Sequence, residues 1–572
     1  MDAAGPTRER SLWSLALLGV VGAALALRLW GIRHGLPFVY NPDELSHFVP
    51  KAVTFHAEGH FDPGYYVNPP AFSYLLYVVF AVVFGGSDGV VDAFAERPED
   101  VFLAARVTAA LVSAAAVAVL YCAGRRFFDR GVGLLAAAVL AVAFLPVHWS
   151  HQAVNDTPAL LAVAAALLGS AGIFRLGRRR DYLLGGAAVG LAAATKYTAG
   201  ILVLVVLGAA LLHLRRGRRP ALLGLGLAGA AAVVAFIAGN PYALLAPGDF
   251  WSGLTQLSVT PQGEVKLGQE GSGIVYYLWA LTWGLGWIPL VAAAAGAVLL
   301  IVRRDPLALV LLPAPAVFVL FMGLQERYFG RWLMPILPVL ALLAGYAAAA
   351  AVRWVASARP CAAPLAAVLA AASLLVQGLF FSVHGDLVLA REETRNATRE
   401  WLLANVPART RVVVEPTVPG DWFRDPAGDG PRWQRVSVRA ALGRLVDEGR
   451  VDPADLPEGR VPAHVPAARY VRYLRPEVLD FFEARGVCWV VAGSFEWGRA
   501  LSDPDLVPGA IAYYRELEQR ADVAFAATPY RDGAGPVEFN FDLSNNYYPL
   551  AYERPGPEMK VYRLRGGACS TA

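Results

Sequence analysis

Long apolar runs recur along most of this chain and limit what it can fold into. Since about 20 helical residues cross the hydrocarbon core of a bilayer, we interpret the runs as membrane spans. They cover residues 11–30, 101–123, 131–149, 157–175, 182–195, 198–214, 220–239, 274–302, 306–323, 331–352 and 362–383. Hydrophobic residues make up 56% of the sequence and charged residues only 17%, which excludes an ordinary soluble protein. The predicted fold is a polytopic α-helical membrane protein with about 11 transmembrane helices.

Arginine clusters between the runs predict how the chain is oriented in the cell membrane. They occur at every second connection: Arg125-Arg126, Arg178-Arg179-Arg180, Arg215-Arg216, Arg218-Arg219, Arg303-Arg304, and Arg353 with Arg359. Because cytoplasmic loops are enriched in Lys and Arg, we place these clusters and the N-terminus in the cytoplasm. The first run has no small-residue cleavage site after it, so we expect a retained helix. Membrane topology accounts for the basic residues, and no nucleic-acid partner is expected.

The composition changes near His384 and predicts two domains, 1–383 in the membrane and 384–572 outside the cytoplasm. Within the first, residues 33–100 form a long outer loop in which we expect two surface helices with aromatic side chains at headgroup level. In the second, a helical period over 391–405 and β-prone runs at 411–415 and 487–491 predict a small α/β domain. Cys488 and Cys569 both fall in this domain, and the sequence leaves open whether they pair.

Acidic residues mark two candidate sites on the predicted outer face. Asp43-Glu44 begins the long loop, and Asp156 in Asn155-Asp156-Thr157-Pro158 precedes the fourth span. Each is also explained as a helix cap, with Asn41 or Asp43 capping the first. Carboxylate oxygens suit Mg²⁺ or Mn²⁺ and imidazole suits Zn²⁺. Asp43 and Asp156 are therefore candidate ligands of a divalent metal cofactor, near the histidines at positions 47, 56, 60, 148 and 151.

Four cations fall on the same predicted face, namely Lys196, Lys266, Arg327 and Arg331. Side chains of this type hold phosphate groups, since Lys supplies a point charge and Arg a forked set of donors. The alternative is that they extend to lipid headgroups. No nucleotide-binding glycine motif, paired-cysteine metal motif or zinc-protease helix occurs, and Asp503-Pro504-Asp505 has the composition of a turn.

Six short motifs together resemble integral-membrane glycosyltransferases of the GT-C fold, most closely the bacterial glycosyltransferase family 39. These proteins are relatives of the protein O-mannosyltransferases and lipid A aminoarabinose transferases. The motifs are Asp43-Glu44, Tyr66-Val67-Asn68-Pro69-Pro70-Ala71, Asn155-Asp156-Thr157-Pro158, Thr195-Lys196-Tyr197-Thr198, Glu326-Arg327-Tyr328 with Pro335 and Pro338, and Thr394 to Leu402 with Asn405-Val406-Pro407.

The resemblance implies transfer of a sugar from a polyprenyl-phosphate donor to a glycan, lipid or protein acceptor at the outer leaflet, with inversion. The resemblance implies that Asp43, Glu44 and Asp156 are catalytic and that Asp43 activates the acceptor. It implies that Lys196, Arg327 and Tyr328 bind the donor phosphate. It also implies that His47, Asn68 and Asn155 bind the substrates. Relatives carry Glu-Lys or His where this chain has Val67-Asn68. This loop therefore offers a hydrogen-bonding Asn68 in place of the usual ligand.

Two other functions fit some of the same observations. A transporter or lipid flippase would have ionisable residues or broken helices near the bilayer midplane, whereas the polar residues here collect at one predicted surface. A relative without catalytic activity that scaffolds envelope assembly would not need Asp43 and Asp156. We expect a membrane glycosyltransferase.

Overall fold

The computed structural model describes residues 5–215, 217–259, 267, 271–325, 327–428, 430–540 and 547–569. The chain forms two compact units. The helical unit runs to Asp386, without residues 33–40. The C-terminal unit begins at Leu387 and also includes Arg33–Tyr40 and Leu267.

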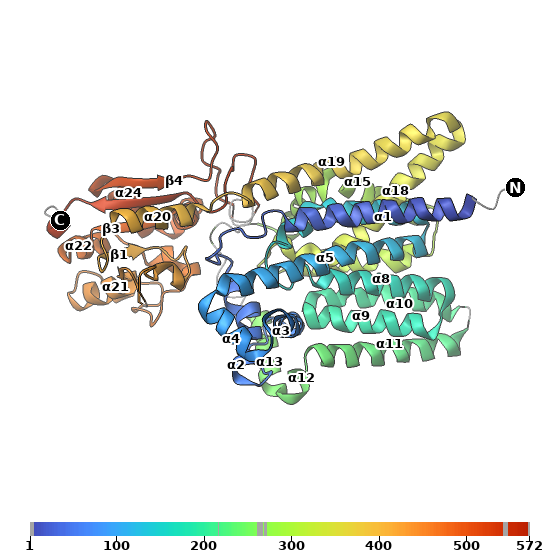
Figure 1. Ribbon diagram of the computed structural model, residues 1–572, viewed down its shortest axis with the longest axis horizontal. Helices are drawn as coiled ribbons and strands as arrows, with labels where there is room; N and C mark the ends of the chain where they lie inside the picture. Colours follow the sequence, from blue (N-terminus) through green and yellow to red (C-terminus); the bar gives the residue numbers. More distant parts are fainter. Residues whose placement is uncertain are drawn as a thin grey trace. The chain divides into compact units, whose positions relative to one another are not determined.

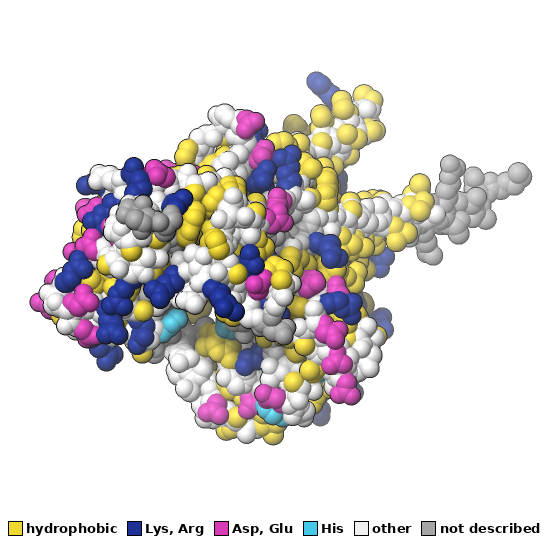
Figure 2. Space-filling model, turned by 60° about the vertical axis from the view of Figure 1, so that its left-hand side comes forward, with side chains coloured by type: hydrophobic (Ala, Val, Ile, Leu, Met, Phe, Trp, Pro, Cys, Tyr) yellow, Lys and Arg dark blue, Asp and Glu magenta, His cyan; other side chains and the backbone are white. Residues whose placement is uncertain are grey.

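Eight helices in the described residues are long and apolar enough to cross a membrane. They are Ser11–Leu29, Pro98–Phe127, Ala159–Leu176, Tyr197–Leu214, Arg218–Gly239, Gly273–Val302, Gly330–Ala358 and Pro360–Asn405. The first lies in α1 (Gly5–Leu29), and the second and third are α5 and α8. The chain is a multi-pass integral membrane protein, as the sequence predicts. Figure 2 shows hydrophobic side chains gathered toward the upper right of the view, as lipid-facing surfaces require.

The other three predicted spans are also helical but shorter than a full crossing. They are α6 (Arg130–Val142), α9 (Arg179–Thr195) and the pair α16 (Leu307–Leu311) with α17 (Pro313–Gly323). The run after α6 leaves helical geometry at Ala143 before α7 (Phe144–Trp149), and Pro313 interrupts the third. Apolar composition alone therefore predicts about 11 spans. Eight of these form helices that are long enough to cross a membrane.

Small residues let the helices that carry the candidate site pack closely. On α9, a Cβ added to Gly186 or Gly190 would lie 2.0 Å from a carbonyl oxygen of α11 (Arg218–Gly239), belonging to Ala228 and Ala232 respectively. Glycine at such positions allows two backbones to touch in a membrane. The helices α8, α9, α10 (Val203–Leu214) and α11 lie side by side in Figure 1. This packing fixes the end of α9, where Lys196 follows.

The long first loop is helical over much of its length, and the position of these helices at a membrane surface stays a prediction. A one-turn π-helix η1 (Glu44–Phe48) leads into α2 (Val49–Glu58), followed by α3 (Ala71–Phe84) and α4 (Ser87–Glu96). The last two meet at 88° and would add a ninth span if they crossed together. The bend places α3 and α4 in different directions.

The C-terminal unit is built on a mixed five-stranded sheet, in the order β2-β1-β3-β5-β4. The strands are β1 (Arg411–Val414), β2 (Gln434–Arg435), β3 (Trp489–Gly493), β4 (Ala521–Ala527) and β5 (Met559–Leu564). Side chains of β3 alternate between two apolar cores: Val490 and Ala492 enter one, and Val491 the other. Helices α20 (Thr394–Asn405), α21 (Val438–Asp447), α22 (Glu477–Ala484) and α24 (Pro508–Arg520) complete the unit. The predicted α/β architecture is confirmed.

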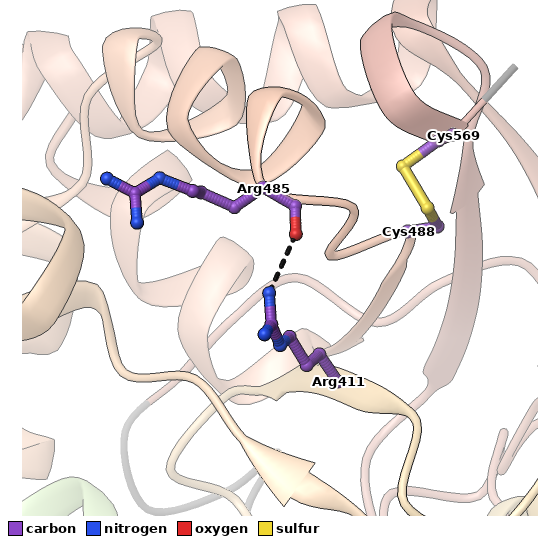
Figure 3. Close-up of a disulfide and its surroundings, with 4 residues drawn as sticks. All are labelled: Arg411, Arg485, Cys488 and Cys569. Atoms are coloured by element: carbon purple, nitrogen blue, oxygen red, sulfur yellow. Dashed lines mark hydrogen bonds between the residues drawn. A yellow bond between two sulfur atoms is a disulfide. The ribbon is translucent and has the colours of Figure 1, made fainter.

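A disulfide joins Cys488, just before β3, to Cys569 after β5. Figure 3 shows the bridge beside a hydrogen bond in which Arg411 Nη1 donates to the carbonyl oxygen of Arg485, at 3.0 Å. Both cysteines are buried, with 6% and 4% of their surface exposed. The bridge closes the question that the sequence leaves open, and it ties the end of the chain to the central strand.

Removing the bridge should destabilise the C-terminal unit. The cysteines are 81 residues apart, and the chain-entropy estimate for a loop of this length is about 4.5 kcal/mol. We expect Cys569→Ser to lower the guanidinium midpoint, measured by proteolysis of this unit in the full chain. Cys361→Ser is the control, because Cys361 is an exposed free cysteine. Equal midpoints for the two variants would contradict a stabilising bridge.

Candidate functional site

The turn that opens the long loop is shaped by Asn41. Its side-chain Oδ1 accepts hydrogen bonds from the backbone N–H groups of Asp43, at 2.9 Å, and Glu44, at 3.1 Å. Asn41 is therefore the cap, one of the two possibilities that the sequence offers, and Asp43 makes no capping hydrogen bond. The following helical turn is of the π type, which is frequent at functional sites. The carboxylate of Asp43 is thus available for other contacts.

Glu44 holds this turn to the rest of the helical unit. It is completely buried and forms a forked pair with Arg106 of α5, with Nε–Oε1 and Nη2–Oε2 distances of 2.7 and 2.9 Å. Oε1 also accepts the backbone N–H of Ala153, at 3.0 Å. Arg106 in turn donates to the carbonyl oxygen of Ile32, at 3.0 Å. Glu44 therefore connects three segments, the turn, α5 and the loop that carries Asp156.

Asp43 faces a cation and a histidine. Its Oδ2 lies 2.6 Å from Nη2 of Arg331, which belongs to the 3-10 helix η5 (Gly330–Ile336). Its Oδ1 lies 3.9 Å from His47 Nε2, and the His47 ring stacks on Tyr65 with centroids 4.5 Å apart. Side-chain exposure is 28% for Asp43 and 26% for His47, so both are accessible to a ligand.

The electrostatic environment keeps Asp43 ionised. Burial alone would raise the pKa of its carboxyl group, but the positive charge of Arg331 and the neighbouring His47 outweigh that effect and lower it. Burial is the main cause that lowers the pKa of His47, although the charge of Asp43 opposes it. At neutral pH Asp43 is therefore a carboxylate beside a neutral imidazole.

Asp156 and Lys196 form a second, more deeply buried ion pair. Lys196 Nζ contacts Asp156 Oδ1, and the side-chain exposures are 11% and 3%. Asn155 Nδ2 donates to the carbonyl oxygen of Thr195, at 2.7 Å, and so fixes the loop before α8 against the end of α9. Arg331 Nε lies 4.0 Å from Asp156 Oδ2. Asp43, Arg331, Asp156 and Lys196 thus form a chain of four alternating charges, which we call the charge chain.

The other predicted site residues are not members of the charge chain. Arg327 is exposed and packs over the Phe329 ring, with its guanidinium 5.1 Å from the centroid. Tyr328 is buried, and its ring lies 4.3 Å from that of Tyr276. Asn68 is half-buried. Lys266 and Glu326 lie outside the described residues.

The histidines do not gather around a metal. His56 contacts Ser87 Oγ and the Tyr77 carbonyl oxygen, both at 3.0 Å, and His151 contacts the Trp30 carbonyl oxygen at 2.8 Å. The described residues contain no group of three or more His, Cys, Asp or Glu side chains placed to hold a metal ion. Asp43 and Asp156 are each paired with a cationic side chain, Arg331 and Lys196 respectively. This donor set does not fit the divalent ion that the sequence suggests, and we derive no step through a metal.

Sequence reasoning missed the partner of Glu44 and underrated Arg331. Arg106 is a single cation inside an apolar run, and an intramembrane charge is a signal that a partner exists. Which acidic residue it meets depends on a contact between positions 62 residues apart. Arg331 is a candidate cation in the sequence. The phosphate-binding role is nevertheless assigned to Arg327, because Arg327 stands in the recognised motif. The structure gives Arg331 the contact with Asp43.

Comparison with known proteins agrees with this arrangement. Residues 68–240 match the family described as dolichyl-phosphate-mannose-protein mannosyltransferase. ArnT from Cupriavidus metallidurans in the apo state superposes with a TM-score of 0.51 at 15% identity, over 87% of this chain and 95% of that chain. The archaeal oligosaccharyltransferase AglB from Archaeoglobus fulgidus, solved with an inhibitory peptide and a dolichol-phosphate, superposes with a TM-score of 0.50 at 12% identity, over 97% of this chain and 89% of that chain.

The structural similarity extends over nearly the whole chain, and the family match falls on the segment with Asp156 and Lys196. The chain therefore shares its overall fold with these membrane glycosyltransferases. No curated protein gives a significant match to its sequence. The family match over residues 68–240 and the shared fold agree with the resemblance found in the sequence.

The Glu44–Arg106 pair predicts a distinctive pattern of stability in the helical unit. Breaking a buried ion pair from one side leaves an uncompensated charge and costs about 3–5 kcal/mol. We expect Glu44→Gln or Arg106→Met alone to lower the thermal unfolding temperature strongly, and the double variant to recover most of the loss. Thermal unfolding of the purified protein measures this. A stable, folded Glu44→Gln protein without transferase activity would instead point to a direct chemical role for Glu44.

Proposed function

We propose that this glycosyltransferase moves a sugar from a polyprenyl-phosphate donor to a hydroxyl group of an acceptor glycan, lipid or protein, with inversion at the anomeric carbon. The observation that carries the proposal is the charge chain, because it combines carboxylates and cations at one end of the spans. A polyprenyl-phosphate donor is supported by the dolichol-phosphate bound to the similar archaeal oligosaccharyltransferase.

On the acceptor side, Asp43 is the proposed base. The acceptor hydroxyl gives its proton to the Asp43 carboxylate while its oxygen bonds to the anomeric carbon. Asp43 suits this role better than Asp156, since 28% of its side chain is exposed against 3%. His47 and Asn68 are proposed to hydrogen-bond the substrates beside it. Glu44 supports Asp43 by holding its turn in place.

On the donor side, the bond between the anomeric carbon and the phosphate oxygen breaks, and its electron pair leaves with the polyprenyl phosphate. Lys196 and Arg327 are proposed to bind the phosphate oxygens, because fixed cations stabilise the charge that develops on a leaving group. Asp156 and Asn155 hold Lys196 in place from below, and Tyr328 is proposed to fix the backbone beside Arg327.

Arg331 couples the two sides of the proposed reaction. It contacts Asp43 at 2.6 Å and lies 4.0 Å from Asp156, so it is shared between the base and the cation site. An arriving phosphate competes with Asp43 for the guanidinium group. Asp43 becomes a stronger base as that contact weakens, because a nearby opposite charge lowers the pKa of a carboxyl group. Donor binding would then activate the base.

We also propose that the charge chain faces outward and that the N-terminus is cytoplasmic. The arginine clusters fall at the opposite ends of the same helices: Arg125 and Arg126 end α5, whereas Arg106 lies toward its start. Positive charge in short loops marks the cytoplasmic side. The Cys488–Cys569 disulfide supports an extracytoplasmic C-terminal unit, because disulfides persist in oxidising compartments.

Replacing the proposed base should remove transfer without unfolding the protein. We expect Asp43→Asn to lower the rate by about 10²–10⁴-fold, the usual contribution of a positioned base. The measurement is transfer from radiolabelled polyprenyl-phosphate sugars in membranes that contain the protein. Glu58→Gln is the matched control, since Glu58 is an exposed carboxylate of the same loop that pairs only with the exposed His60 among the described residues. Equal transfer by wild type and Asp43→Asn would remove Asp43 from the chemistry.

The pH dependence of transfer should report the contact between Asp43 and Arg331. The folded-state pKa of Asp43 is lowered. The base therefore stays ionised as the pH falls toward about 3.9, the ordinary pKa of an aspartate side chain. In Arg331→Gln the raising effect of burial is no longer opposed by that charge. The acid limb of kcat/KM should therefore move to higher pH in Arg331→Gln. An unmoved acid limb in an active variant would show that Asp43 does not control it.

A further inference from the structure

A basic cavity lies at the ends of the spans that are remote from the charge chain. Its volume is about 760 Å³, and its lining comes from α5, from the residue after α5, from α8 and from the start of α9. The lining residues are Cys122, Arg125, Arg126, Phe128, Leu168, Arg175 and Arg180. Four guanidinium groups and no carboxylate line this cavity.

The cavity lies one membrane thickness away from the charge chain. Along α5, 19 residues separate Arg106, which holds the Asp43 turn, from Arg125 in the cavity lining. At 1.5 Å per residue this is about 29 Å, close to the roughly 30 Å of a hydrocarbon core. Arg125 therefore lies at the interface opposite to Asp43. By the positive-inside assignment this is the cytoplasmic leaflet.

Protein contacts account for two of the four arginines. Arg126 Nη2 pairs with the buried Asp181 Oδ1, at 2.9 Å. Arg175 donates to the carbonyl oxygens of Arg126 and Phe127, at 3.0 and 2.6 Å, and so caps the end of α5. These two arginines stabilise helix ends, as cations do at helix C-termini.

The other two arginines have no such explanation. Arg125 packs over the Tyr121 ring, with its guanidinium 5.8 Å from the centroid, and Arg180 is exposed at the start of α9. Neither has a carboxylate within ion-pair distance among the described residues. Two forked donor groups therefore face a cavity with an excess of positive charge.

We propose that this cavity binds the phosphate headgroup of an anionic phospholipid from the cytoplasmic leaflet. Arg125 and Arg180 would donate to the phosphate oxygens in the forked geometry that arginine favours. Phe128 and Leu168 supply apolar surface for the first part of the acyl chains. Basic pockets between spans on this side of a membrane suit such headgroups, and the volume falls in the range of ligand cavities. The site is separate from the charge chain and does not depend on the proposed reaction.

The test is lipid retention by the full chain, measured by native mass spectrometry after release from nanodiscs. The discs contain phosphatidylcholine with a small fraction of phosphatidylglycerol that has the same acyl chains. We expect wild type to retain phosphatidylglycerol, and Arg125→Gln/Arg180→Gln to bind it about 30-fold more weakly, the effect of two arginines near a headgroup. Arg218→Gln/Arg219→Gln removes the same charge from the same predicted membrane side, at the start of α11 and outside the cavity lining, and should retain the lipid.

Three outcomes would overturn the proposal. Equal loss in both double variants would mean that the lipid senses overall charge and not the cavity. Retention that is unchanged in Arg125→Gln/Arg180→Gln would remove the site altogether. Displacement of phosphatidylglycerol by millimolar inorganic phosphate would identify a soluble phosphate as the ligand. If the double variant does not fold, the single variant Arg180→Gln replaces it, because that exposed side chain contributes no protein contact among the described residues.

Discussion

The buried pair between Glu44 and Arg106 is the constraint on which the candidate site depends. Two ionised groups removed from water need good geometry and further hydrogen bonds to offset their lost hydration. Both conditions hold, since the pair is forked and each partner also bonds to a backbone group of another segment. Moving the turn by one residue would place another side chain opposite Arg106 and break the forked pair. Asp43 is the preceding residue in the chain, so the same register positions it.

From this anchor the site is assembled by pairs of neighbouring residues. Glu44 fixes the turn, so that Asp43 projects toward Arg331. Asn155 bonds to the carbonyl oxygen of Thr195, so that the next residues, Asp156 and Lys196, meet. In each case one residue is buried for structure and its neighbour carries the exposed or charged group. Adjacent polar residues of one motif therefore need different measurements: protein stability for Glu44 and sugar transfer for Asp43.

The sequence was sufficient to predict that Asp43, Asp156 and Lys196 lie at one end of the spans. That prediction follows from alternating crossings marked by arginine clusters, which need no tertiary information. The contacts of Glu44 with Arg106 and of Asp43 with Arg331 could not be predicted in the same way. They join positions 62 and 288 residues apart, and only helix packing decides which cation meets which carboxylate. Similarly, periodicity predicted strands at 411–415 and 487–491, but the order of the five strands and the 488–569 disulfide are non-local.

Cationic side chains are paired with carboxylates at one end of the α5–α8 bundle, whereas those that line the cavity at the other end face no carboxylate of its lining. In the charge chain, each carboxylate is matched by a cation, so the resting site has little net charge to attract the abundant anionic lipids around it. At the other end, four guanidinium groups face a cavity lined by no carboxylate. Cations concealed by internal partners are released only to a ligand that can compete for them at short range. Under the proposed function, short-range contacts of this kind would select a phosphate-linked donor among the phosphate headgroups of other lipids. Long-range attraction would instead favour the commonest lipid.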